Sequence, residues 1–166
     1  MITIISGSSR GDNNSKKVAL EYQRMLQEMK VEVCLLSLDE IRVTERDEHF
    51  IEMEKKYLVP ATKLIIIMPE YNGSYPGILK LMIDNSDIGR AWAYKKVLLT
   101  GVSTGRAGNL RGMEHLTGSL LHMKMIVHPN RLPISVVNTL MNNENQFADK
   151  ATLASVQQQL KEFLTF

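Results

Sequence analysis

Short runs of aliphatic and β-branched residues alternate with segments of helical periodicity along this chain of 166 residues. The aliphatic runs predict strands at 2–6, 31–38, 63–68, 96–102 and 125–127. The segments between them predict helices at 14–30, within 44–57, from Pro76 to Ile88, at 108–123 and at 147–163. In the first helix, for example, Val18, Tyr22 and Met25 fall on one face.

Strand and helix alternating in this way indicate a parallel sheet covered by helices on both faces. Because crossover connections are right-handed, the compact solution is a flavodoxin-like three-layer α/β/α sandwich. We predict one domain over residues 1–166, with a five-stranded parallel sheet in the order 2-1-3-4-5. In such a sheet ligands bind at the carboxyl ends of the strands where the order reverses, so the turns after strands 1, 3 and 4 are the candidate site.

Composition excludes several classes of function. A formal charge of +2 without clustered Lys or Arg gives no nucleic-acid-binding surface. Cys34 is the only cysteine, so neither an intrachain disulfide nor a cysteine-based zinc site can form, and the four histidines lack metal-ligand spacing. No run approaches the roughly 18 apolar residues that a spanning helix needs, and the N-terminus lacks a basic signal region. We therefore expect a cytoplasmic protein without a metal or a membrane segment.

The first of the three turns reads "SGSSRGDNNS", residues 6–15. Its hydroxyls, amides and single guanidinium can all donate to a phosphate, and the helix that follows adds free N–H groups. The turn has neither the GxGxxG of a dinucleotide fold nor the GK[ST] of a P-loop, and Asp12 brings a negative charge near the proposed phosphate. Taken alone, an N-capped surface turn explains this stretch equally well.

The second and third turns are "MPEYNGSYPG", which follows strand 63–68, and "VSTGRAGNLRG", which follows strand 96–102. The backbone N–H groups of Asn72 and Gly73 and the face of Tyr71 could hold a flat heteroaromatic ring. The third turn adds small residues, Arg106 and a second helix start near Gly108. Three donor-rich turns at one edge of a sheet predict a site for a phosphorylated planar ligand.

The segments "GSSRGDNNSKKVA", "MPEYNGSYPGILKLMIDN" and "STGRAGNLRG" resemble the three characteristic segments of the NADPH-dependent FMN reductase family, which includes chromate, quinone and azo reductases. The resemblance implies that the FMN phosphate is held by Ser8, Arg10, Asn13, Asn14 and Ser15. It implies that the isoalloxazine and ribityl chain are lined by Pro69, Glu70, Tyr71, Asn72 and Gly73. It places the pyrimidine edge of the ring against Ser103, Thr104, Gly105 and Arg106.

The same resemblance implies hydride transfer from NADPH or NADH to FMN, followed by ping-pong transfer to a small electron acceptor. The flavin would carry the redox chemistry, so no side chain is predicted to be catalytic, and Glu70 is interpreted as structural. A flavodoxin-like electron carrier that binds FMN without using NAD(P)H is the alternative. The apolar helix from Pro76, together with the resemblance, predicts a homodimer or homotetramer.

Overall fold

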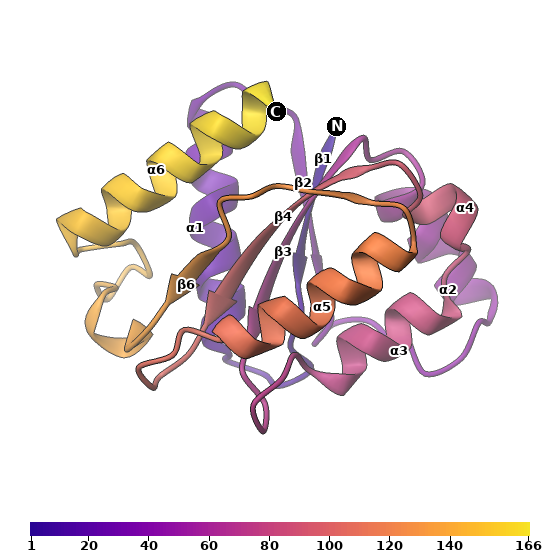
Figure 1. Ribbon diagram of the computed structural model, residues 1–166, viewed down its shortest axis with the longest axis horizontal. Coiled ribbons are helices and arrows are strands. Elements are labelled where there is room, and N and C mark those ends of the chain that lie inside the picture. Colours follow the sequence, from indigo (N-terminus) through magenta and orange to yellow (C-terminus); the bar gives the residue numbers. More distant parts are fainter.

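The computed structural model describes residues 1–166, and its centre is a parallel sheet (Figure 1). Its strands are β1 (Ile2–Ser6), β2 (Val33–Ser37), β3 (Lys63–Pro69), β4 (Lys96–Val102), β5 (Ile126–Val127) and β6 (Leu132–Ile134). The order β2-β1-β3-β4-β5 confirms the predicted flavodoxin-like topology. The predicted number of strands was wrong by one, because β6 also pairs with β4.

The fifth position of the sheet is shared by two short strands. β5 pairs with the first residues of β4, and β6 pairs with its last three, Thr100 to Val102. Between them, the His128 N–H still donates to the Val97 carbonyl at 2.8 Å. The next N–H on that side, that of Asn130, donates instead to His128 Nδ1 at 3.2 Å, and the Leu99 carbonyl accepts from the Gln159 amide at 3.3 Å. Pairing therefore stops and restarts. β6 itself contains Pro133, which an edge strand tolerates.

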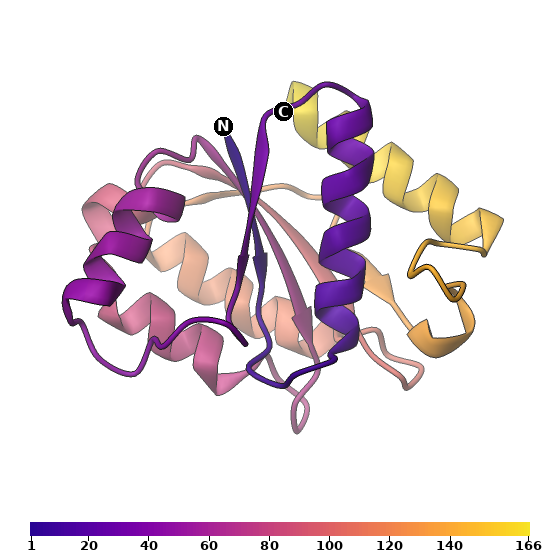
Figure 2. The same ribbon diagram turned by 180° about the vertical axis from the view of Figure 1, so that it is seen from behind.

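Helices cover both faces of the sheet, as the alternation predicts. α1 (Asn14–Glu28) and α6 (Lys150–Thr165) lie on one face (Figures 1 and 2). The other face carries α2 (Glu48–Met53), the π-helix η1 (Glu54–Leu58), α3 (Gly77–Asn85), α4 (Ile88–Ala91) and α5 (Leu110–His122). Along β3, Leu64 and Ile66 join the core beneath α2–α5, whereas Ile65 and Ile67 join the core beneath α1 and α6. This strict alternation is what burial on both faces requires.

The helix predicted from Pro76 to Ile88 is two helices. Pro76 has an extended backbone (ψ 140°) and precedes α3 as its N-cap instead of lying in its first turn. At the other end, the Asp87 side chain accepts from the Arg90 N–H at 3.1 Å and caps α4. The Asp87 N–H donates to the buried Glu54 carboxylate at 2.6 Å, so an acceptor from η1 stabilises the non-helical backbone between α3 and α4.

Two other helices begin later than predicted because of their caps. Gly108 and Asn109 have φ angles of +57° and +62°, so α5 begins at Leu110. The Asp149 side chain accepts from the Thr152 N–H at 2.7 Å, so α6 begins at Lys150, and Phe147 forms a bridge with Met141. The charged stretch 44–57 contains α2 and most of η1 instead of one solvated helix, with Phe50 and Met53 buried. No helix has the length and apolar character needed to cross a membrane.

Candidate functional site

A cavity of about 700 Å³ lies at the carboxyl ends of β1, β3 and β4. All but two of the predicted site residues line it: Arg10, Asn13, Asn14, Ser15, Pro69, Glu70, Tyr71, Asn72, Ser103, Thr104, Gly105 and Arg106. The exceptions are Ser8 and Gly73. The three turns therefore meet at one edge of the sheet, because parallel strands end there together.

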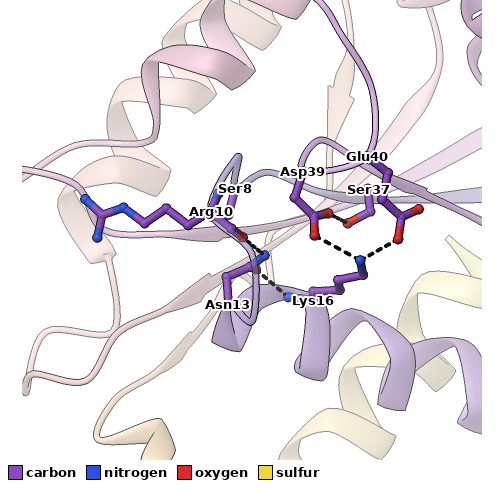
Figure 3. A network of polar contacts seen from close by, with 7 residues as sticks. All are labelled: Ser8, Arg10, Asn13, Lys16, Ser37, Asp39 and Glu40. Atoms are coloured by element: carbon purple, nitrogen blue, oxygen red, sulfur yellow. Dashed lines mark hydrogen bonds and ion pairs between the residues drawn. The ribbon is translucent and has the colours of Figure 1, made fainter.

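The first turn is held in shape by Asn13, the N-cap of α1. Its Oδ1 accepts from the Lys16 N–H at 2.8 Å, and its Nδ2 donates to the Arg10 carbonyl at 2.6 Å (Figure 3). The Asn13 side chain is thus used within the turn, which leaves only its backbone N–H for a ligand. The N–H groups from Gly11 to Ser15 have no acceptor in the chain, so the start of α1 presents several unpaired donors to the cavity.

Ser15 contributes the most telling side chain of this turn. The residue is fully buried, it lines the cavity, and its Oγ has no hydrogen-bond partner. A buried hydroxyl without a partner costs free energy, so such groups are uncommon unless a ligand or water completes them. Since Ser15 lies in the first turn of α1, an anion bound at the helix N-terminus would provide the missing acceptor.

Ser8 is buried, does not line the cavity, and is connected to it by a hydrogen bond to Tyr71. Its Oγ shares a hydrogen bond of 2.7 Å with the Tyr71 hydroxyl and accepts from the Arg10 N–H at 3.2 Å. The exposed Arg10 guanidinium lies 4.2 Å from the centre of the Tyr71 ring, a cation–π distance. These contacts join the first turn to the second and bring a cation to the cavity mouth.

An ion-pair network anchors the start of α1 to the end of β2. The Lys16 ammonium contacts Asp39 at 2.9 Å and Glu40, and Ser37 donates to Asp39 (Figure 3). Burial alone would raise the pKa of Asp39, but the hydrogen bonds from Ser37 and Lys16 together lower it below its ordinary value. The pKa of Lys16 is raised by its hydrogen bonds to Glu40 and Asp39.

The charge of Asp12, which the sequence placed near the proposed phosphate, is balanced locally. Its carboxylate pairs with Lys17 at 2.8 Å and is exposed to solvent. The hydrogen bond from Lys17 lowers the pKa of Asp12. The acidic side chain therefore does not leave a net negative charge at the start of α1.

The second turn is a tight hairpin built on Asn72 and Gly73, with φ angles of +52° and +76°. The Tyr71 N–H donates to the Ser74 carbonyl at 2.9 Å, and the Ser74 N–H donates back at 3.1 Å. Positive φ at both central positions is the reason for an Asn-Gly pair. The Asn72 and Gly73 N–H groups have no acceptor in the chain, although Gly73 itself lies outside the cavity lining. The Glu70 carboxylate lines the cavity without an ion pair or hydrogen bond in the chain.

The third turn is folded by Ser103, whose Oγ accepts from the Gly108 N–H at 3.0 Å and donates to the Gly105 carbonyl at 2.9 Å. The helix start predicted near Gly108 therefore does not offer the Gly108 N–H to a ligand, because that N–H already donates to Ser103. Free N–H groups instead run from Thr104 to Ala107. Arg106 is exposed and forms no ion pair.

Comparison with known proteins decides the family. The family model for NADPH-dependent FMN reductases matches residues 1–139. The chain belongs to this family.

Individual relatives agree with this assignment. An NAD(P)H-dependent FMN reductase from Pseudomonas aeruginosa is 28% identical over 116 residues, which cover 67% of this chain and 62% of the relative. A 2-hydroxy-1,4-benzoquinone reductase from Burkholderia sp. is 32% identical over 76 residues, or 44% of this chain and 42% of the relative. The matches thus span less than two thirds of either relative's length.

Solved structures match the fold over nearly the whole chain. The flavoenzyme NAD(P)H:acceptor oxidoreductase FerB from Paracoccus denitrificans superimposes with a TM-score of 0.80 at 22% identity, covering 99% of this chain and 94% of FerB. A flavodoxin from the domain Archaea reaches a TM-score of 0.61 at 12% identity, with 99% and 95% covered. At these identities both comparisons establish the fold alone.

The family is described as NADPH-dependent FMN reductases, and the cavity's own donors suit FMN. The orphaned Ser15 hydroxyl and the free N–H groups at the start of α1 suit a terminal phosphate. The half-buried Tyr71 and the free N–H groups after β3 and β4 suit a flat ring with carbonyl oxygens at its edge.

The cavity has a fourth wall that the sequence did not predict. It comes from the 3₁₀ helix η2 (Val137–Thr139), whose Val137 lines the cavity. The Val137 N–H donates to the Ser103 carbonyl at 3.1 Å, and Asn138 accepts from the Asn14 amide at 2.9 Å. Val136 has a φ of +45°, a strained value for a β-branched residue. This part of the chain has the composition of a loop, so nothing in its sequence indicates a role in the site.

Proposed function

We propose that this protein is an FMN-dependent NAD(P)H oxidoreductase that reduces a small acceptor by ping-pong turnover. The buried, unpartnered Ser15 hydroxyl, placed among the free N–H groups that begin α1, is the observation that carries the proposal. Together, this hydroxyl and these N–H groups can bind one phosphate, in a cavity that is also lined by the Tyr71 ring. Bound FMN would supply the chemistry, accepting hydride from a nicotinamide and passing electrons to the acceptor.

The chain's own residues have binding and electrostatic roles in this proposal. Arg10 supplies a cation at the mouth of the cavity, and the start of α1 supplies donors without charge. The free N–H groups of Thr104 to Ala107 would stabilise negative charge on the pyrimidine edge of a reduced flavin, with Arg106 as the nearby cation. The Glu70 carboxylate lines the same cavity without a cationic partner in the chain, so its negative charge would disfavour the negatively charged reduced flavin.

The acceptor class is proposed from the donors and the openness of the site to solvent. Arg10, Thr104 and Arg106 are exposed, so a second flat molecule can approach the same edge after the nicotinamide leaves. A quinone, a free flavin or an azo compound fits this description, and a metal oxyanion, although not flat, is small enough to reach the same open edge. The similarity to a 2-hydroxy-1,4-benzoquinone reductase makes a benzoquinone the first acceptor to test. The cytoplasmic location predicted from the sequence stays a prediction.

The test begins with the visible spectrum of the purified protein after incubation with FMN and gel filtration. Mass spectrometry of the released cofactor should find FMN, because the first turn offers donors for a single terminal phosphate. Rapid mixing with NADPH and with NADH under argon should bleach the flavin band, and mixing with a benzoquinone should restore it. Initial rates at varied NAD(P)H and quinone should give parallel double-reciprocal lines.

A flavodoxin-like electron carrier is the alternative function. Such a carrier would retain the flavin band and accept electrons from dithionite, yet NADPH and NADH would leave it oxidised. A protein that stays colourless after incubation with FMN would contradict both functions.

We further propose that two copies associate through the outer face of α5. Leu110 and Leu121 lie three helical turns apart and are 53% and 57% exposed. The apolar residues of the helix after Pro76 support a dimer less than the sequence suggested, because Leu79 and Met82 are fully buried in their own subunit. Leu121→Glu should shift the mass measured by light scattering towards a monomer. Leu20→Glu, an equally apolar exposed position on α1, should not (45% exposed).

A further inference from the structure

Asn109 joins two walls of the cavity from a fully buried position. Its Nδ2 donates to the Pro69 carbonyl at 2.8 Å and to the Met68 carbonyl at 3.1 Å. These carbonyls end β3, immediately before the wall formed by Glu70, Tyr71 and Asn72. Asn109 itself ends the third turn, so a single amide spans about 40 residues of sequence and connects both turns.

The surrounding backbone is shaped to admit this amide. A Cβ at Gly101 would lie 2.2 Å from the Gly108 carbonyl oxygen and 3.0 Å from the Asn109 Cβ. A Cβ at Gly112 would lie 2.0 Å from the Asn109 Oδ1. Both contacts are far closer than real Cβ atoms tolerate, so only glycine lets the third turn fold back on β4 and α5 with Asn109 between them.

The position of Asn109 matters because the backbone hydrogen bonds between β3 and β4 end close to it. β3 and β4 pair as far as Pro69 and Val102, and one more bond follows, from the Glu70 N–H to the Val102 carbonyl at 3.2 Å. Beyond it, the turns that carry Tyr71 and Arg106 separate. Besides the Asn109 amide, the hydrogen bond between Ser74 and His115 joins the second turn to α5, and that bond is exposed.

The incomplete hydrogen bonding of the Asn109 amide argues against a role in folding stability alone. Its Oδ1 is buried without a hydrogen-bond partner, which costs free energy, and its φ of +62° would suit glycine at least as well. A half-satisfied buried amide is therefore a poor stabiliser. What it does provide is a directional link, because two carbonyls in fixed positions define where the amide, and hence the third turn, must lie.

We propose that Asn109 is a positioning residue that fixes the separation of the second and third turns and so presets the cavity for the flavin ring. The proposal rests on FMN as the ligand. Asn109 does not line the cavity, so it acts through the backbone of its two neighbouring turns.

The test uses three variants of the whole chain. Asn109→Gly keeps the left-handed backbone without strain and removes only the amide. Asn109→Asp keeps the shape, but its carboxylate cannot donate to two carbonyls. Val156→Ala, in the buried face of α6 and not part of the cavity lining, is the control for a general loss of stability.

Two measurements decide the proposal. Hydrogen–deuterium exchange without FMN should become at least tenfold faster in residues 69–75 and 103–109 of Asn109→Gly, and remain unchanged there in Val156→Ala. The dissociation constant for FMN should rise at least tenfold in Asn109→Gly and further in Asn109→Asp, with an altered flavin circular dichroism spectrum.

Unchanged exchange in the two turns of Asn109→Gly would overturn the proposal. So would faster exchange with FMN affinity and spectrum within twofold of the parent, because the amide would then stabilise the turns without positioning the flavin. Failure of the parent protein to bind FMN would contradict the proposed function instead. The exchange experiment would still report whether Asn109 holds the two turns together, since it contains no flavin.

Discussion

Replacing Ser15 by alanine separates a ligand-binding hydroxyl from a structural one. The Ser15 Oγ is buried in the first turn of α1 and has no partner in the protein. If it completes its hydrogen bonding with the FMN phosphate, Ser15→Ala should weaken FMN binding and leave the free protein no less stable. A hydroxyl that served folding would show the opposite, with lower stability of the free protein.

The expected loss of affinity follows from the charge of the acceptor. A hydrogen bond to a charged group contributes about 1.5–3 kcal/mol. Because each 1.4 kcal/mol is a factor of ten, the dissociation constant for FMN should rise by about ten- to a hundredfold. The remaining donors, the free N–H groups from Gly11 to Ser15, are backbone groups that the substitution preserves.

The expected change in stability has a different sign. An unpaired buried polar group costs roughly 1–3 kcal/mol, and alanine removes it without creating a large cavity. The free energy of unfolding of the flavin-free protein should therefore stay the same or rise by up to about 1 kcal/mol. Addition of saturating FMN should then stabilise the variant less than the parent, because its affinity is lower.

Fluorescence titration with FMN measures the affinity, and urea unfolding without FMN measures the stability. Ser155→Ala, an exposed serine whose hydroxyl donates to the Ala151 carbonyl in α6, is the control and should leave the affinity unchanged. Unaltered affinity in Ser15→Ala would refute the assignment of the phosphate to this helix start. A less stable free protein would show that the hydroxyl has a partner within the fold.

Three further predictions concern the same cavity. Arg10→Ala should weaken FMN binding, measured by titration, by about 1.5–3 kcal/mol. The far-UV circular dichroism spectrum should not change, because Arg10 is exposed and contacts only neighbouring turns. Unchanged affinity would mean that the guanidinium stays on the Tyr71 ring. Gly101→Ala should destabilise the protein by about 1–3 kcal/mol and reduce FMN affinity, because its Cβ would meet the Gly108 carbonyl, whereas Gly77→Ala, with open space around it, should do neither. Lys16→Met should lower the free energy of unfolding by up to about 1 kcal/mol at neutral pH. The folded pKa of Asp39 lies below its unfolded value, so its contribution is present above about pH 4 and is lost as the pH falls through the folded pKa. The difference between the parent and Lys16→Met should therefore shrink in acid, and a difference that stayed constant as the pH fell would contradict this assignment.

The fold was predictable because periodicity and connection rules leave few solutions. Leu64 to Ile67 read as a strand buried on both faces, and the structure divides them between two cores. β6 could not be predicted in the same way. It has only three residues, one of them Pro133, and it exists because β4 leaves an edge open beyond Val97, where the Asn130 N–H donates to His128 instead of to β4. Such a strand depends on its partner, and its own pattern carries no period.

The location of the cavity was predictable for a related reason. Turns that follow parallel strands meet at one edge, so residues as distant in sequence as Arg10, Tyr71 and Arg106 were expected together, and they line one cavity. Val137 was not, because η2 does not follow a predicted strand. It reaches the cavity through hydrogen bonds to the third turn, and those depend on where β6 delivers the chain.

Which donors remain available to a ligand is a question that sequence alone leaves open. Asn13, Asn14 and Ser15 were equally good candidates by chemical type. The structure uses the Asn13 side chain as a cap and directs the Asn14 amide to Asn138, while the Ser15 hydroxyl receives nothing. A residue type gives the capacity to donate, but capping and packing decide whether that capacity is already used. The strongest candidate for a ligand contact is therefore the group that the fold buries and leaves without a partner, which is why Ser15 is the first residue to mutate.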